Sequence, residues 1–320
     1  MEVLNPLQRW LEYERTFDGQ TWIDFTREHA DIPIFAVAAY LLIVFYVPPI
    51  LEKRQKFSLK TAFASWNLFL AVFSTVGLTR TLPHLWSNLR EHGFKWTVCT
   101  DPADWYNNGP CGLWVGLFIY SKIPELLDTV FLVLQKKRVI FLAWFHHTTV
   151  LLYCWHAYHN RIGPGLWFAS ANYTVHSVMY TYYFLMAAGL HKLARPCAPV
   201  ITTMQIAQMM LGTTVTVYSA IWSQTEPCKV DPANYKMGLM MYMSYFWLFS
   251  ILFLNKYFGP KPAPKADTPP RKKRQGSLDL TMCGVDLGTH DGAGFFHSGG
   301  RASKDNTPYS SRSELNAKNE

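Results

Sequence analysis

Three histidines lie in the most apolar and aromatic part of this sequence. His146 and His147 are adjacent, and His176 follows in the next apolar segment. Imidazole can act as a nucleophile, a general base or a metal ligand. Ionisable side chains at membrane depth mark functional sites by default, and the structural alternative is a pair of hydrogen bonds in a helical core. The stretch 141–183 is therefore the first candidate for a reaction centre.

Other polar side chains fall at matching depths in neighbouring apolar segments. Counting inward from the basic turns at ~1.5 Å per residue gives one set roughly 9–10 Å deep and another at roughly 18 Å. The shallower set is Asp128, His146, Tyr182 and Gln205, and the deeper set is Lys122 and His176. We expect a polar chamber that opens toward the basic turns. A network of hydrogen bonds that only packs helices is the alternative.

Helical spacing places many of these side chains on shared faces. The recurring residues are Asn172, His176, Tyr180 and Tyr183 in one segment, Lys122, Glu125 and Thr129 in a second, and Gln205 and Gln208 in a third. Lys122 can pair with Glu125 and Asp128, which lowers the cost of burying all three charges.

A metal centre would need more converging ligands than this stretch offers. The other histidines nearby are His156 and His159, and they fall toward the opposite end of their segment. We therefore expect no metal and no cofactor. A metal-dependent membrane desaturase or hydroxylase remains the alternative enzyme class.

The composition indicates a helical membrane protein. Of 320 residues, 49% are hydrophobic and 16% are charged, against roughly 25% charged in soluble domains. The apolar residues gather in runs of about twenty, enough to cross the bilayer as helices. The N-terminus lacks the pattern of a secretory signal peptide. The net charge is +8, but the basic residues do not gather in a soluble domain. This argues against nucleic-acid binding.

Seven membrane spans are predicted between a lumenal N-terminal segment, 1–31, and a disordered basic and polar tail, 259–320. The predicted spans are 32–51, 61–82, 112–134, 139–158, 165–188, 199–223 and 237–258. The N-terminal segment suits an amphipathic stretch at the interface. A long polar loop is predicted over 83–111.

Basic residues set the predicted orientation. They concentrate in the turns after the first, third and fifth spans, at Lys53, Arg54, Lys56, Lys60, Lys136, Lys137, Arg138, Lys192 and Arg195. The positive-inside rule places these turns and the C-terminus in the cytosol, and the N-terminus in the lumen. Cys99, Cys111 and Cys228 then face the oxidising side, where one disulfide is plausible. The spacing does not choose between Cys99–Cys228 and Cys99–Cys111.

Four short motifs resemble one enzyme family. The segment 122–129 resembles a K-x-x-E-x-x-D-T box, 143–147 an H-x-x-H-H box, 172–183 an N-x-x-x-H-x-x-M-Y-x-Y-Y box and 203–208 a T-x-x-Q-x-x-Q box. Together they resemble the ELO family of very-long-chain fatty acid elongases, the 3-ketoacyl-CoA synthases of the endoplasmic reticulum. The resemblance covers roughly residues 30–258.

The resemblance implies a fold, a reaction and a location. The fold is all-α, with seven transmembrane helices, six of them forming an inverted barrel around an acyl tunnel. The reaction condenses a long-chain fatty acyl-CoA with malonyl-CoA and releases CO2 and CoA. It needs no cofactor and takes place in the endoplasmic reticulum membrane. The implied partners are membrane lipid, the reductases and dehydratase of the elongation cycle, and a second copy in a homodimer.

The resemblance also implies roles for individual residues. His146 would attack the thioester to give an acyl-imidazole, while His147, Asn172, His176 and Tyr182 would position groups and stabilise developing charge. The residues implied to shape the site and bind substrate are Lys122, Glu125, Asp128, Tyr180, Tyr183, Gln205, Gln208, Lys136 and Lys137. Basic turns suit the phosphates of CoA. The family's lumenal disulfide matches Cys99–Cys228. The motifs look closer to elongases of saturated and monounsaturated chains, although some elongases of eighteen-carbon polyunsaturated chains are similar.

One position departs from the family pattern. Ala143 stands where the H-x-x-H-H box has its first histidine. If that histidine is essential, the chain is a catalytically impaired elongase-like protein. If it only orients the other two, a small residue is tolerated, and we favour an active enzyme because His146 and His147 are intact. A transporter or lipid-binding protein without catalysis is the remaining alternative.

Overall fold

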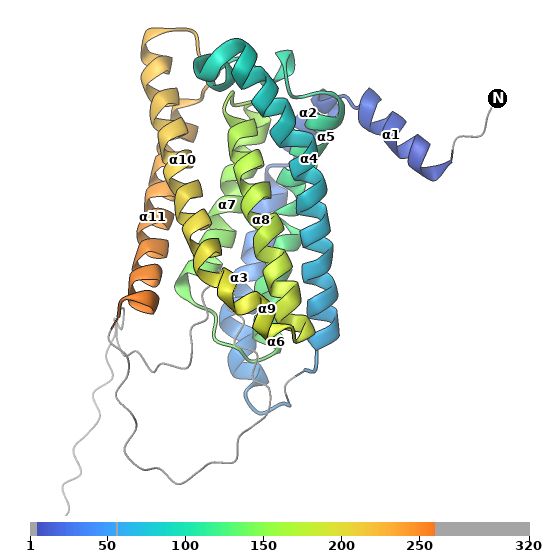
Figure 1. Cartoon of the computed structure of the whole chain (residues 1–320), viewed down its shortest axis with the longest axis vertical. Helices are drawn as coiled ribbons and strands as arrows, with labels where there is room; N and C mark the ends of the chain where they lie inside the picture. The colour runs from blue at the N-terminus through green and yellow to red at the C-terminus, as the bar shows by residue number, and fades with distance from the viewer. Residues whose placement is uncertain (1–4, 56, 260–320) are drawn as a thin grey trace, which may run out of the picture. The chain divides into compact units, whose positions relative to one another are not determined.

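The computed structural model describes residues 5–55 and 57–259, and these form an α-helical bundle (Figure 1). Its helices are α1 (Pro6–Thr16), α2 (Gly19–Glu28), α3 (Asp31–Leu51), α4 (Lys60–Cys99), α5 (Gly109–Ser121), α6 (Leu127–Leu134), α7 (Phe141–His159), α8 (Gly165–Ala188), α9 (His191–Ala194), α10 (Ala198–Thr225) and α11 (Pro232–Tyr257). Short 3₁₀ turns are η1 (Pro102–Asp104), η2 (Pro124–Leu126) and η3 (Arg195–Cys197). The predicted tail beyond residue 259, the extreme N-terminus and Lys56 lie outside the described residues.

Helices occupy all seven segments predicted as spans, which fits a polytopic membrane protein. Four helical runs in the described part of the chain are long and apolar enough to cross a bilayer: Asp31–Leu51, Lys60–Cys99, His191–Thr225 and Pro232–Tyr257. The number of spans, their barrel arrangement and the orientation of the termini stay predictions.

The second predicted span is part of a much longer helix. We predicted a polar loop over 83–111, but α4 continues to Cys99, with one non-helical residue at Gly93 (φ 83°). The prediction was wrong because polarity indicates where a membrane boundary lies and does not by itself stop a helix. Gly93 kinks α4 instead of ending it, since glycine adopts positive φ without a Cβ clash, and a second helical stretch continues to Cys99.

The third predicted span is broken in the middle. α5 ends at Ser121, a 3₁₀ turn spans Pro124–Leu126, and α6 begins at Leu127. Proline has no N–H for the ladder and its ring clashes with the preceding turn, which explains the break at this position. Tighter bonds replace the ladder, such as Ile123 N–H to the Tyr120 carbonyl at 3.2 Å. The break lies inside the K-x-x-E-x-x-D-T box.

α4 and α8 pack closely along their length, and α10 and α11 lie side by side (Figure 1). Gly77 of α4 permits the first contact, because a Cβ there would collide with the Tyr173 ring of α8. The Tyr173 hydroxyl donates to the Trp114 carbonyl of α5 at 2.9 Å. Three helices are thereby held together around the segment that carries Asn172 and His176.

The N-terminal segment forms two helices, α1 and α2. α1 is fixed by the buried carboxylate of Glu14, which accepts from Trp114 Nε1 at 2.8 Å and pairs with Arg80 at 3.2 Å. Trp10 and Tyr13 on its other face are exposed. An exposed aromatic face agrees with the predicted interfacial position.

Candidate active site

The broken helix places a buried ion pair at the centre of the bundle. Lys122 Nζ lies 2.8 and 2.9 Å from the two carboxylate oxygens of Glu125, and 3.1 Å from Asn172 Oδ1 on α8. Ser121 Oγ donates to the same carboxylate at 2.8 Å. Lys122 is 2% exposed and Glu125 is 3% exposed. The pairing predicted between Lys122 and Glu125 is confirmed.

The chain of contacts continues to His176. Asn172 Nδ2 lies 3.1 Å from His176 Nε2, one helical turn further along α8. Asn172 and His176 are each 8% exposed. His176 also interacts electrostatically with Lys122, His146 and His147. The structure therefore brings together the three histidines that the sequence singled out.

The two adjacent histidines of α7 present their rings nearly at right angles. The ring centroids of His146 and His147 are 5.4 Å apart with an interplanar angle of 85°. Tyr245 packs 5.0 Å from the His146 ring, and Tyr40 packs 6.4 Å from the His147 ring. Neither imidazole has a hydrogen-bond partner among the residues that the structure describes. Their ring nitrogens are thus available to a substrate.

The helix under these histidines is fixed through its backbone. The Tyr245 hydroxyl of α11 lies 3.2 Å from the His146 carbonyl and also bonds to the Thr149 hydroxyl. On the other side, the Tyr40 hydroxyl of α3 donates to Thr129 Oγ1 at 2.9 Å. Tyr245 of α11 therefore holds α7 through its backbone, and the Tyr40–Thr129 bond joins α3 to α6 beside His147, without using the imidazole nitrogens.

Asp128 has different partners from those predicted. Its carboxylate accepts from Trp66 Nε1 at 2.6 Å and from the Tyr180 hydroxyl at 2.7 Å. It has electrostatic contact with Lys122 but no direct bond to it. The Tyr180 ring stands edge-on to His176, with centroids 5.1 Å apart. Asp128 thus orients the tyrosine that supports His176.

The remaining tyrosines and glutamines of the motifs are divided between two places. Tyr182 and Tyr183 are buried in the apolar cluster between α4 and α8. Gln205 of α10 is buried, and its Nε2 lies 3.5 Å from Met179 Sδ, while its buried Oε1 has no partner among the described residues. Gln208 lines a separate small hollow with Trp167. Substrate contacts of these four residues stay predictions.

The predicted CoA-binding lysines lie in the turn between α6 and α7. Lys136 Nζ donates to the Glu52 carbonyl at 3.0 Å and also bonds to the Arg54 carbonyl. Lys137 Nζ lies 5.9 Å from the Phe63 ring. Two of the basic turns are therefore adjacent in space, beyond the end of α7 where His146 lies. Their contact with phosphate stays a prediction.

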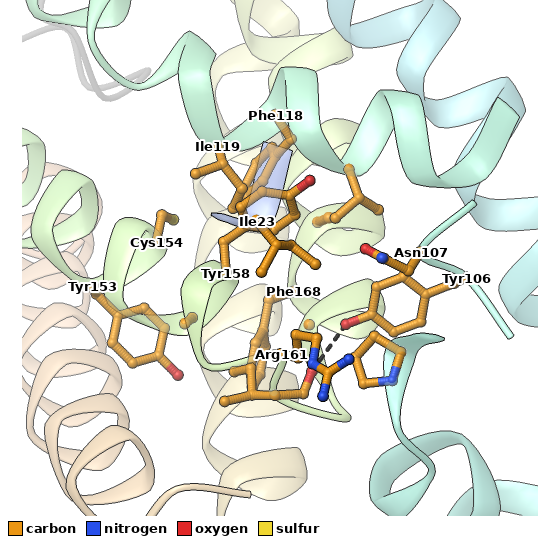
Figure 2. Close-up of a pocket in the computed structure, with 16 residues that line it drawn as sticks. Ile23, Tyr106, Asn107, Phe118, Ile119, Tyr153, Cys154, Tyr158, Arg161 and Phe168 are labelled. Carbon is orange, nitrogen blue, oxygen red and sulfur yellow. Dashed lines mark hydrogen bonds between the residues drawn. The ribbon is translucent and has the colours of Figure 1, made fainter. Parts of the chain in front are cut away.

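A small apolar pocket lies beyond the histidines, toward the C-terminal end of α7 (Figure 2). Phe118 and Cys154 form part of its wall. Lys122 Nζ lies 4.2 Å from the centroid of the Phe118 ring. Cys154 follows His147 by about two helical turns, or ~10 Å along α7. The pocket and the polar site therefore meet at Phe118.

Loops close the far end of the pocket. The Tyr106 hydroxyl donates to the Ile162 carbonyl at 2.9 Å, and both residues line the pocket (Figure 2). Asp101 lies 3.6 Å from Arg161 and 3.3 Å from Lys229. The loop that follows α4, the loop between α7 and α8 and the loop before α11 are thereby joined.

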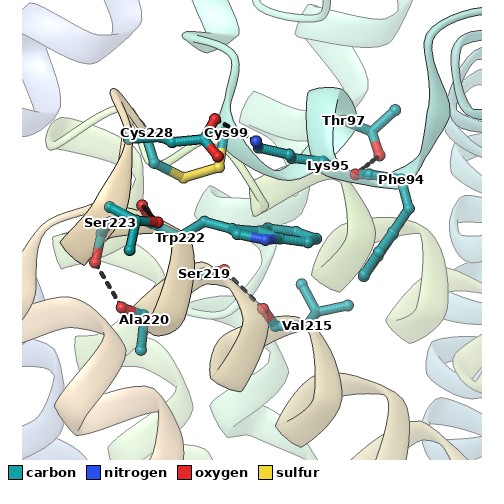
Figure 3. The surroundings of a disulfide bond; sticks show 12 residues. Phe94, Lys95, Thr97, Cys99, Val215, Ser219, Ala220, Trp222, Ser223 and Cys228 are labelled. Carbon is teal, nitrogen blue, oxygen red and sulfur yellow. Dashed lines mark hydrogen bonds and ion pairs between the residues drawn. A yellow bond between two sulfur atoms is a disulfide. The ribbon is translucent and has the colours of Figure 1, made fainter.

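A disulfide between Cys99 and Cys228 ties the same loops together (Figure 3). Lys229 N–H donates to the Cys99 carbonyl at 2.8 Å, and Gly163 N–H donates to the Lys229 carbonyl at 2.7 Å. Cys111 is a buried free thiol. The pairing implied by the family resemblance is confirmed, and Cys99–Cys111 is not formed.

Ala143 is buried, with 2% of its surface exposed. It lies one turn before His146 and His147 on α7, and its side chain is already enclosed by neighbours.

Within residues 5–55 and 57–259, no group of three or more His, Cys, Asp or Glu side chains is arranged to hold a metal ion. A metal-free site stays a prediction. Stoichiometric iron in the purified protein would restore the desaturase alternative.

Sequence reasoning missed the residues that hold the site from other helices. Trp66, Tyr245 and Tyr40 each direct a polar group at it. Each is an aromatic side chain with a polar tip in an apolar segment. That signal is weak, because such residues are equally common at membrane interfaces.

The ELO: GNS1/SUR4 family matches residues 25–265 of the sequence. This chain belongs to the ELO family. The motif resemblance is therefore confirmed, and the match includes the polar site, the disulfide and most of the residues that line the pocket.

Several relatives cover most of this ELO chain. Very long chain fatty acid elongase 4 of Trypanosoma cruzi (strain CL Brener) is 44% identical over 265 residues, covering 82% of this chain and 92% of the relative. Fatty acid elongase 3 of Trypanosoma brucei brucei (strain 927/4 GUTat10.1) is 42% identical, covering 78% and 91%. Very long chain fatty acid elongase 6 of Gallus gallus is 38% identical, covering 81% and 96%.

Proposed function

We propose that this chain is a fatty acid elongase that condenses a long-chain fatty acyl-CoA with malonyl-CoA. Membership of the ELO family and the names of its relatives support an enzyme of fatty acid elongation. The observation that carries the proposal is the meeting of two environments at Phe118. A polar site with unengaged imidazoles adjoins a pocket lined by apolar and aromatic side chains.

The first half-reaction is acyl transfer to histidine. A ring nitrogen of His146 attacks the thioester carbonyl, the new C–N bond forms, and the C–S bond breaks. The CoA thiolate leaves and takes the proton that the imidazole loses. Splitting the condensation into two steps in this way is nucleophilic catalysis.

The second half-reaction is decarboxylative condensation. Malonyl-CoA loses CO2, and the electron pair of the broken C–C bond attacks the acyl carbon. The C–N bond to His146 breaks, the departing imidazole nitrogen takes up a proton from solvent to restore the neutral ring, and 3-ketoacyl-CoA leaves. Negative charge develops on carbonyl oxygens in both steps. Preorganised donors in a water-poor site stabilise such charge strongly, and Lys122 and Tyr180 lie nearby to shape that field.

Substrate placement follows from the two ends of α7. The hydrocarbon tail extends past Phe118 into the apolar pocket, where burying each CH₂ contributes about 0.8 kcal/mol. The CoA phosphates meet the basic turns beside Lys136 and Lys137 at the opposite end. The thioester then lies between the two, beside His146.

The cellular setting is part of the same proposal. The enzyme acts as a multi-pass protein of the endoplasmic reticulum membrane, where the reductases and dehydratase of the cycle process its product. A homodimer is proposed on the family resemblance.

The deciding experiment is mass spectrometry of the purified protein after incubation with a long-chain acyl-CoA. We expect a gain of one acyl mass with release of CoA, and loss of both in His146→Ala. His159→Ala, at the far end of the same helix, is the matched control and should retain the adduct. Absence of the adduct and of CoA release in the wild-type protein would overturn the mechanism. A condensation assay with labelled malonyl-CoA across acyl lengths then defines the substrate.

A further inference from the structure

The orientation of the Asn172 amide follows from chemistry. Lys122 carries an ammonium group, which has three donors and no acceptor. Its neighbours are the two oxygens of Glu125 and one atom of Asn172, at 2.8, 2.9 and 3.1 Å. Only the amide oxygen can accept from that ammonium. Asn172 must therefore present Oδ1 to Lys122.

That orientation leaves the amide nitrogen facing His176. Asn172 Nδ2 lies 3.1 Å from His176 Nε2, and an amide NH₂ can only donate. Nε2 must then hold a lone pair, since an N–H on both atoms would repel. A neutral imidazole carries one ring proton, so the proton of His176 belongs on Nδ1.

Burial makes it costly to exchange the hydrogen-bond partners in this arrangement. All four groups are nearly inaccessible to water, at 2% exposure for Lys122, 3% for Glu125 and 8% for both Asn172 and His176. Reversing the amide would leave a buried ammonium facing an NH₂ group, and unpaired buried charge is costly. Ser121 adds a further bond to Glu125 and anchors the pair in the broken helix.

We propose that Lys122, acting through Asn172, fixes His176 as the Nδ1–H tautomer, so that His176 donates a hydrogen bond to substrate and does not act as the nucleophile. The Nε2 lone pair is already engaged by Asn172. Among the described residues none accepts a hydrogen bond from Nδ1. That donor is therefore available to the carbonyl oxygen on which negative charge develops.

The inference rests on the proposed condensation and assigns different roles to the histidines. Nucleophilic attack is left to His146, whose ring has no hydrogen-bond partner among the described residues. Lys122 and Asn172 are positioning residues, because they act on the substrate only through His176. Glu125 keeps the ammonium in place and neutralises its charge.

The tautomer can be measured directly, without turnover. We would record ¹⁵N spectra of the ring nitrogens in ¹⁵N-histidine-labelled full-length protein in lipid nanodiscs, assigning His176 by the signal lost in His176→Asn. The expected result is a protonated Nδ1 and an unprotonated Nε2. A protonated Nε2 at His176 would overturn the inference. The result does not depend on elongase activity, so failure of the proposed function would be seen separately in the acyl-adduct assay.

Asn172→Asp replaces the hydrogen-bond donor that faces His176 Nε2 with an acceptor. A carboxylate can only accept, so Nε2 must now be protonated, and the spectrum should change accordingly. Asn160→Asp is the matched control, because Asn160 lies beside His156 in a second Asn–His pair at the end of α7. It should leave the His176 signals unchanged. An unchanged His176 spectrum in Asn172→Asp would contradict the proposal.

Kinetics then separate a donor from a nucleophile. The side-chain NH₂ of asparagine lies close to the position of Nδ1, so His176→Asn keeps a donor, whereas the similarly sized His176→Leu does not. We expect kcat to fall by roughly 10²–10³-fold in the leucine variant, the loss typical of one oxyanion donor, and to fall clearly less in the asparagine variant. Equal loss in both, with acyl-adduct formation also abolished in both, would show that His176 itself carries the chemistry. Equal loss with the adduct retained would equally reject the donor role.

Discussion

The two ends of the proposed substrate path are stabilised by different kinds of interaction. At the polar site, Lys122 and Glu125 are nearly inaccessible to water and form an ion pair in which each neutralises the other's charge. At the far end of the pocket, Asp101 pairs with Arg161 and Lys229 while remaining partly exposed, and the Cys99–Cys228 disulfide joins the same loops. A buried pair has large energetic consequences when it is broken, whereas exposed pairs contribute about 0–1 kcal/mol. The first arrangement suits a site that must keep one geometry, and the second suits a loop closure.

The largest expected effect is on the buried pair. Glu125→Gln leaves the Lys122 ammonium buried without a counter-charge, and we expect a loss of about 3–5 kcal/mol in stability. Asp101→Asn should cost no more than about 1 kcal/mol. Thermal unfolding of both variants in the same detergent measures the difference. The double variant Lys122→Met/Glu125→Gln should be more stable than Glu125→Gln alone. If Glu125→Gln and Asp101→Asn cost the same, the distinction between the two ends fails.

The disulfide should affect stability more than chemistry. Cys99→Ala combined with Cys228→Ala removes a link that closes a long stretch of chain, and loss of a native disulfide costs about 2–5 kcal/mol. The polar site does not touch it. We therefore expect a lower unfolding temperature with acyl-adduct formation retained below that temperature. His146→Ala should show the opposite pattern, with stability kept and the adduct lost. A folded double variant that forms no adduct would contradict this separation.

Filling the pocket should change which acyl chains are used. Ala169 is buried on α8 and lines the pocket, so Ala169→Leu takes space from the end of a long chain. A methylene in a hydrophobic pocket is worth about 1–3 kcal/mol in discrimination. We expect kcat/KM for the longest substrate to fall about tenfold or more relative to shorter ones. Ala71→Leu, in the cluster between α4 and α8, is the control and should leave the length profile unchanged. If both variants had the same dependence of kcat/KM on acyl length, the acyl chain would not occupy this pocket.

Restoring the family histidine tests the departure at Ala143. Because Ala143 is enclosed, Ala143→His should overpack α7 and cost about 1–3 kcal/mol. We expect no gain in condensation rate, since the rings of His146 and His147 are already placed by Tyr245 and Tyr40. Labelled malonyl-CoA assays beside thermal unfolding decide this. A clear rise in rate would show that the chain is impaired by its alanine.

The smallest expected effect is at the pocket's closure. Tyr106→Phe removes the hydrogen bond to the Ile162 carbonyl and should cost about 1 kcal/mol. Its acyl-adduct yield should match wild type, because the bond lies at the far end of the pocket from the histidines. Thermal unfolding and the adduct assay check the two statements together. A strong loss of adduct would mean that the closure acts on the polar site.

Features that repeat along one helix could be predicted from the sequence. The helical membrane class follows from apolar runs of sufficient length. The Lys122–Glu125 pair and the Asn172–His176 contact join residues three and four apart, so helical periodicity alone indicates them. The order of the four boxes added the family, and with it the pairing of Cys99 with Cys228.

Other predictions failed where the backbone departs from a regular span. The helix through Pro83 continues to Cys99 because polarity does not stop a helix, and the span through Pro124 breaks because its backbone bond is missing. Lys122 contacts Asn172 across helices, and Asp128 bonds to Trp66 and Tyr180. Counting apolar residues predicts neither the continuation of α4 nor the break at Pro124.

Only the tertiary structure decided which helices meet at the site. The contacts of Lys122 with Asn172, of Asp128 with Trp66 and Tyr180, and of Tyr245 with the His146 carbonyl all join residues far apart in the chain. The sequence determined which polar groups stand on each helix. Periodicity describes one helix at a time, whereas cross-helix contacts depend on the rotation and tilt set by packing, such as that of Gly77 against Tyr173. The proposed tautomer of His176 depends on such a contact, so it could be derived only from the folded chain.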